Sequence, residues 1–64
     1  MFELKIKTNN AAFHDDAGGV PDALAKSGEV RRILHRVIES IEHGNTQGLC
    51  LDYNGNVVGE WMMR

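Results

Sequence analysis

The chain opens with apolar and charged residues in alternation. Phe2, Leu4 and Ile6 would point to one side, and Glu3, Lys5 and Lys7 to the other. A period of two predicts a strand with one buried face. Thr8, Asn9 and Asn10 are turn-forming residues that end this strand. Phe13 follows in a polar stretch, and we expect it to anchor the connection in the core.

The strongest pattern lies between Glu29 and His43. Six aliphatic residues recur there at helical spacing: Val30, Ile33, Leu34, Val37, Ile38 and Ile41. This pattern predicts an amphipathic helix with one apolar stripe. Ser27 suits its N-cap, and Gly44 suits the left-handed residue that follows a helix.

Residues 14–28 are rich in glycine and polar residues and form a connection. Pro21 to Lys26 reads as a separate short helical turn, because proline fits the first turn of a helix. Ser27 and Gly28 are expected to end that turn before the long helix starts.

The C-terminal third reads as a hairpin with two alternative registers. A two-residue loop would pair Tyr53 with Asn56, whereas a three-residue loop would pair Asp52 with Asn56. The three-residue register puts the apolar residues Leu49, Leu51, Val57 and Trp61 on one face, and Cys50, Val58, Glu60 and Met62 on the other. Because a slip of one residue exchanges the faces of a strand, we expect the three-residue loop.

These elements predict a single domain over residues 1–64 of the α+β class, in the order β-α-β-β. A three-stranded antiparallel sheet would pack on the long helix, with a short helical turn in the connection. The longest strand, at the C-terminus, is expected in the middle of the sheet.

Composition narrows the function classes. Nine acidic residues against seven basic ones give a net charge of −2, which is no footprint for general nucleic-acid binding. One cysteine excludes an internal disulfide and a cysteine-rich zinc site. No apolar run approaches the ~20 residues needed to cross a bilayer, and no signal-peptide pattern is present. We therefore expect a small soluble protein of the cytoplasm that binds no membrane.

No group of residues predicts catalysis, a metal site or a cofactor. His14, Asp15 and Asp16 are adjacent, and adjacent residues rarely converge on one point, so they are read as a polar loop. The segment from Asp52 to Asn56 resembles the start of a calcium loop but lacks its later glycine and glutamate. Cys50 has no partner at a catalytic spacing. An enzyme is not expected.

Two surfaces are candidates for partner binding. Lys26, Arg31, Arg32 and Arg36 gather toward the start of the helix, either as a patch for an anion or acidic protein, or as ordinary surface charge. The sheet face turned away from the helix would carry Val58, Met62 and Cys50. That face is either an interface, with another molecule or a second copy, or the scattered exposure normal in a small domain.

Three segments resemble a group of small proteins encoded by bacteriophages and prophages. They are the opening LKIKTNNAAF (4–13), the helix EVRRIL (29–34) and the ending DYNGNVVGEW (52–61). The resemblance covers both ends and the helix, and departs over residues 14–28. It implies no catalytic residue.

The resemblance implies a small protein of a mobile element that acts on a host protein. Anti-CRISPR inhibitors are a known class of this size and architecture. The leading hypothesis is a non-enzymatic protein-binding module that inhibits a host defence complex in the host cytosol by occluding its nucleic-acid-binding surface. Asp15, Asp16 and Asp22, or the open sheet face, would make the contact. The alternative is a small nucleic-acid-binding accessory protein that uses Arg31, Arg32 and Arg36.

Overall fold

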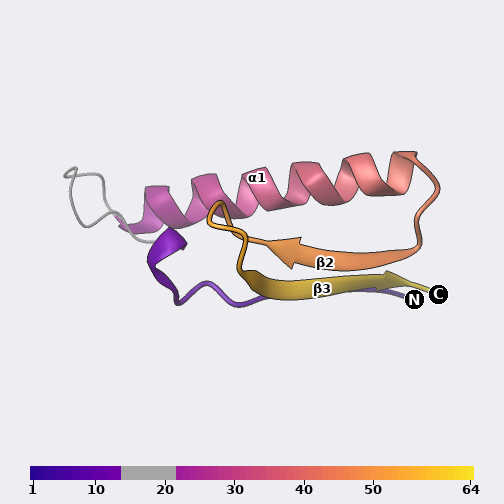
Figure 1. Ribbon diagram of the computed structural model, residues 1–64, viewed down its shortest axis with the longest axis horizontal. Helices are drawn as coiled ribbons and strands as arrows, with labels where there is room; N and C mark the ends of the chain where they lie inside the picture. Colours follow the sequence, from indigo (N-terminus) through magenta and orange to yellow (C-terminus); the bar gives the residue numbers. More distant parts are fainter. Residues whose placement is uncertain (14–21) are drawn as a thin grey trace.

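The computed structural model describes residues 1–13 and 22–64. The elements follow in the order β1 (Phe2–Ile6), η1 (Ala11–Phe13, a 3₁₀ turn), α1 (Asp22–Glu42), β2 (Gln47–Leu51) and β3 (Val57–Met63). The strands form one antiparallel sheet, and α1 lies along one side of it (Figure 1). The predicted α+β fold with β-α-β-β order is confirmed.

The strand order is β1-β3-β2, so the C-terminal strand is central, as predicted. β1 runs antiparallel to β3, with Phe2 opposite Met63 and Leu4 opposite Trp61. The two ends of the chain lie side by side at one end of the sheet (Figure 1). Backbone hydrogen bonds between Met1 and Arg64, of 2.7 and 2.9 Å, hold them there.

Helix α1 runs without a break from Asp22 to Glu42. The prediction of a separate turn ending at Ser27 and Gly28, with Ser27 as the cap of a second helix, is therefore wrong. A glycine inside a helix costs only about 1 kcal/mol. This cost is small, and the continuous helix keeps its regular backbone hydrogen bonds on both sides of Gly28.

A 3₁₀ turn that was not predicted, η1, lies earlier in the chain and packs against α1. Phe13 is fully buried there and confirms the expected anchor of the connection. At its other end α1 stops as predicted. Gly44 has a φ of 89°, its N–H donates to Ile41 O, and the Asn45 N–H donates to Ser40 O. This pair of bonds is the Schellman motif that ends many helices.

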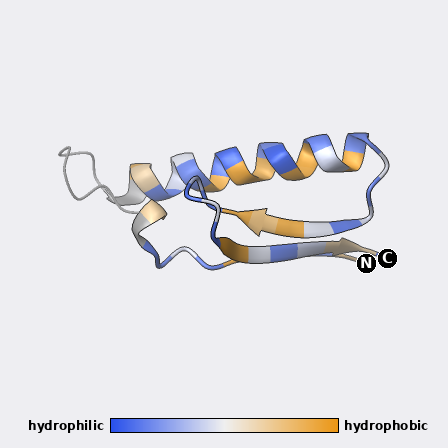
Figure 2. Ribbon diagram, viewed as in Figure 1, coloured by the Kyte–Doolittle hydropathy of each residue, from blue (hydrophilic) through white to orange (hydrophobic). Residues whose placement is uncertain are grey.

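The core lies between α1 and the sheet, and its buried apolar residues are Ala12, Phe13, Ile33, Val37, Cys50, Val58 and Trp61. Figure 2 shows apolar residues on the side of α1 turned toward the sheet. The predicted stripe is wider than the sheet covers, because Leu34 and Ile38 remain 39% and 50% exposed.

The hairpin turn follows the three-residue prediction. The Asp52 N–H donates to Asn56 O over 2.9 Å, and the Gly55 N–H donates to Asp52 O over 3.0 Å. Gly55 has a φ of 86°, the left-handed conformation that this turn requires.

The strands beyond the turn depart from the predicted register. Leu51 pairs with Val57, but Cys50 pairs with Gly59, so β3 carries one extra residue, Val58. This β-bulge shifts the register by one position, and the two strands continue as a two-residue loop would have paired them.

The bulge exchanges the faces of β2. Cys50 and Val58, predicted on the face away from the helix, are buried in the core at 2% and 6% exposure. Leu49, Leu51 and Val57, predicted in the core, are exposed. The predicted faces of these five residues are therefore wrong, whereas Trp61 is buried as predicted.

Candidate functional site

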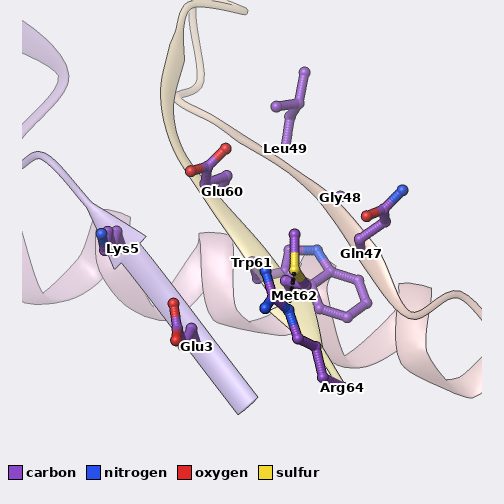
Figure 3. Close-up of a pocket in the computed structure, with 9 residues that line it drawn as sticks. All are labelled: Glu3, Lys5, Gln47, Gly48, Leu49, Glu60, Trp61, Met62 and Arg64. Atoms are coloured by element: carbon purple, nitrogen blue, oxygen red, sulfur yellow. Dashed lines mark hydrogen bonds between the residues drawn. The ribbon is translucent and has the colours of Figure 1, made fainter. Parts of the chain in front are cut away.

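In the part of the chain that the structure describes, no element covers the sheet face turned away from α1, and this uncovered face carries a hollow of about 430 Å³. Figure 3 looks onto this face. Lys5 and Glu60 are direct partners across β1 and β3, and Leu49 of β2 lies opposite Glu60 on the other side. The Arg64 side chain donates to Met62 Sδ over 3.0 Å. The hollow thus combines charges of both signs with exposed apolar side chains.

A second hollow, of about 530 Å³, lies between α1 and β2. Arg32, Arg36 and Ser40 line its helix side. Its opposite wall is formed by β2, and Gly48, Leu49 and Trp61 line both hollows. We call the region formed by the two hollows and the strand between them the β2 surface.

Gly48 lies at the centre of the β2 surface and leaves space there, because it has no side chain. A Cβ atom at this position would lie 2.7 Å from Trp61 Nε1, so the indole occupies the space of a missing side chain. Figure 3 shows the indole nitrogen beside Gly48, and Leu49 projecting away from the sheet. Trp61 is only 3% exposed, whereas Leu49 is 64% exposed. Gly48 thus makes room for the buried indole on the helix side of β2, whereas Leu49 is exposed on the other side.

The backbone of β2 also takes part in this surface. The Met63 N–H donates to Thr46 O, so in the antiparallel alternation Gln47, Leu49 and Leu51 direct their N–H and C=O groups away from β3. Arg32 donates to the outward Leu51 O over 2.9 Å. The outward groups of Leu49 and Gln47 lie further along the same edge.

Two buried carboxylates hold the hairpin tip in place. Glu29 is 7% exposed, and its carboxylate accepts from the Tyr53 N–H over 2.8 Å and from Arg32 Nε over 2.6 Å. Arg32 in turn holds Leu51 O. Because each charge is paired, this cluster fixes the end of β2 against α1.

Asp52 is the second buried carboxylate, at 3% exposure. Its Oδ1 accepts from the N–H groups of Asn54 and Asn56, and its Oδ2 accepts from the side-chain amides of Asn10 and Asn56. Burial pushes the pKa of Asp52 upward, but the hydrogen bonds from Asn56, Asn10 and Asn54 outweigh burial and lower it below its ordinary value.

The structure offers little for catalysis in the part that it describes. Burial raises the pKa of the Cys50 thiol, which keeps it protonated. Among residues 1–13 and 22–64, no three His, Cys, Asp or Glu side chains are placed to hold a metal ion. In the same ranges, no helix is both long and apolar enough to span a bilayer.

The sequence-predicted partner residues are scattered over the fold. His14, Asp15, Asp16 and Pro21 lie outside the described residues. Asp22 is the first residue of α1. Val58 is buried in the core and cannot contact a partner, because the bulge turns it inward. Met62 lines the hollow on the uncovered face, as predicted.

The basic residues of the helix do not act as one patch. Arg31 and Arg36 are exposed, and Arg36 lines the groove beside β2. Arg32 is committed to Glu29 and to Leu51 O. Lys26 is only half exposed. The structure thus brings Arg32 and Arg36 together at the β2 surface and leaves Arg31 apart from it.

Sequence reasoning missed Gly48 and Leu49 as parts of this surface, and Glu29 as the buried carboxylate that holds the hairpin tip. Glu29 precedes the apolar stripe, where an acid normally favours the helix N-terminus and stays in water. The role of Gly48 depends on Trp61 lying over it. The one available signal was a glycine inside a strand, which often marks a close approach. Comparisons with protein-family models, curated proteins and solved structures find no match to this chain.

Proposed function

We propose that the protein is a non-enzymatic protein-binding module that contacts its partner through the β2 surface. The observation that carries this proposal is Leu49, which is 64% exposed where the two hollows meet. Binding energy at protein interfaces concentrates in a few aromatic or apolar anchors inside a polar rim. Here Leu49 is the exposed apolar anchor, and Arg36 and Glu60 lie on the rim.

The kind of partner follows from the resemblance to small phage and prophage proteins. We propose a host protein or protein–nucleic acid complex, specifically a CRISPR-type defence complex whose nucleic-acid-binding surface is occluded in the host cytosol. Glu3 and Glu60 on the uncovered face supply acids suited to a basic channel. Asp15 and Asp16 in the connecting segment and Asp22 at the start of α1 add further acids.

A nucleic-acid-binding accessory protein is the weaker proposal. It needs the basic helix residues as a common phosphate-binding patch. The guanidinium of Arg32 is already engaged by Glu29, which leaves Arg31 and Arg36 as the exposed arginines of that set. This arrangement supports a protein partner more than a nucleic acid.

The test compares substitutions at two leucines whose side chains are equally exposed. Leu49 and Leu24 are 64% and 63% exposed, but only Leu49 lies on the β2 surface. Wild type, Leu49→Asp and Leu24→Asp would be used to retain proteins from a bacterial lysate. The same three would be expressed during phage infection of cells with and without CRISPR immunity.

We expect wild type and Leu24→Asp to retain the same host complex and to restore plaques on immune cells, and Leu49→Asp to do neither. Equal behaviour of the two variants would show that the β2 surface is not the binding site. Binding of DNA or RNA that falls steeply with salt and is lost in Arg31→Glu/Arg36→Glu would favour the accessory-protein proposal instead.

A further inference from the structure

Within residues 1–13 and 22–64, the outer edge of β1 has an ordered set of backbone groups without partners. β1 is an edge strand, because the strand order is β1-β3-β2. Met1 and Arg64 exchange backbone hydrogen bonds, and the Lys7 N–H donates to Val58 O. In an antiparallel pair, bonded positions alternate with non-bonded ones. Odd-numbered residues therefore bond to β3, and Phe2, Leu4 and Ile6 direct their N–H and C=O groups outward.

In a symmetric antiparallel pair of two β1 strands, the outward groups of Phe2, Leu4 and Ile6 must bond to the same even-numbered residues of the other copy. Centring the antiparallel pair on residue 3 would place Glu3 opposite Glu3, and centring it on residue 5 would place Lys5 opposite Lys5. Centring it on Leu4 places Glu3 of each copy opposite Lys5 of the other. Opposite charges stabilise such cross-strand pairs and like charges destabilise them, so the charge pattern selects the register centred on Leu4.

The same register matches the apolar face of the strand. Phe2 would lie opposite Ile6 of the second copy, and Leu4 opposite Leu4. Phe2 is 48% exposed in the single chain, although its ring lies 6.2 Å from that of Trp61. Pairing with Ile6 would cover this exposed ring, and all charged pairs would remain on the opposite face.

The helix adds apolar surface on the same side. Arg36 and Ser40 line the flank of α1 that faces β2. Leu34 and Ile38 lie on the roughly opposite flank of the helix, toward the side of β1. They are 39% and 50% exposed. A second copy that extends the sheet beyond β1 would continue it below this flank and reduce its contact with water.

We infer that the free edge of β1 is a homodimer interface. Two copies pair antiparallel about a two-fold axis at Leu4, and the two three-stranded sheets join into one continuous sheet with both helices on the same face. Leu49 and the hollow beside α1 lie at the opposite edge of each copy and stay free in the dimer. Glu3 and Lys5 line both the dimer interface and the hollow on the uncovered face.

The inference is tested by exchanging the charges at positions 3 and 5. Sedimentation equilibrium of the full chain over a range of concentrations measures the dimerisation of each variant. Glu3→Lys alone makes both cross-strand pairs Lys opposite Lys, and Lys5→Glu alone makes both Glu opposite Glu. The double variant Glu3→Lys/Lys5→Glu restores opposite charges. An equimolar mixture of the two single variants also restores them, but only in mixed dimers.

We expect each single variant to raise the dimer dissociation constant roughly tenfold or more. The double variant and the mixture should recover dimerisation. Lys5→Glu also faces Glu60 within its own chain, so thermal unfolding of each variant provides the fold control. Leu49→Asp should dimerise like wild type. A wild-type monomer at all concentrations, or a dimer insensitive to Glu3→Lys, would overturn the inference.

Discussion

The side-chain amide of Asn10 donates a hydrogen bond of 2.8 Å to Asp52 Oδ2, joining positions 42 residues apart in the sequence. Asn10 also accepts from the Ala12 N–H at the start of η1. Asp52 forms the hairpin turn through Asn54 and Asn56. One carboxylate therefore connects the turn between β2 and β3 to the segment that carries Phe13 into the core.

Asp52 should make stability depend on pH in the acid range. Its pKa is lower in the folded protein than its ordinary value of 3.8. Its contribution is therefore complete above 3.8 and is lost as the pH falls through the lower folded value. As the pH falls below about 4, we expect the urea concentration at the unfolding midpoint of the wild type to decrease, because this contribution is lost. Asp52→Asn should have a lower midpoint at pH 7 and a smaller further loss in acid. Equal acid-dependent losses in both proteins would contradict this role.

Alanine at Gly59 and alanine at Gly28 should change the free energy of unfolding in opposite directions. A Cβ atom on Gly59 would lie 1.8 Å from the backbone oxygen of Lys5, whereas one on Gly28 would meet nothing within 4 Å. Gly59→Ala forces β1 away from β3 and should lower the free energy of unfolding by about 3 kcal/mol. Gly28→Ala should raise it by about 1 kcal/mol, because alanine favours the helix. Urea denaturation measures both, and a stable Gly59→Ala protein would contradict the observed strand approach.

Glu29 and Arg32 should be energetically coupled. Glu29→Gln and Arg32→Met each remove one partner of the hydrogen-bonded pair that holds the hairpin tip. A double-mutant cycle from urea denaturation should give a coupling energy of about 1 kcal/mol, limited by the partial exposure of Arg32. The cycle of Glu29 with Arg31 is the matched control and should give a coupling near zero. Equal coupling in the two cycles would show that the pair does not fix the tip.

Cys50 should react slowly with a thiol reagent in the folded protein. Its side chain is buried, and burial raises its pKa. We expect labelling by DTNB to be on the order of a hundredfold slower than in urea, because reaction requires opening of the structure. In the control protein Leu49→Cys with Cys50→Ser, the thiol should react rapidly. The reverse order of reactivity would support the register without the bulge.

The register of β2 against β3 depends on tertiary packing, whereas other features of the fold depend on neighbouring residues. The alternation at Phe2, Leu4 and Ile6, the apolar stripe of the helix and the turn at Gly55 each depend on neighbours within a few residues, and the structure bears them out. The strand order also followed from the pattern, because the longest apolar strand suits the centre of a sheet. The continuous helix did not follow, because the local signals at Ser27 and Gly28 predicted a break, whereas one helical glycine costs only about 1 kcal/mol and does not interrupt α1.

The chain by itself determined which elements form, their order and where the helix and hairpin end, because those features depend on local backbone preferences and on apolar periodicity. Only the tertiary structure decided which side of β2 faces the helix. The bulge at Val58 shifts the register of β2 against β3 by one residue. That shift buries Cys50 and exposes Leu49. The composition of the β2 surface depends on this shift, because a strand has a period of two and one extra residue exchanges its faces.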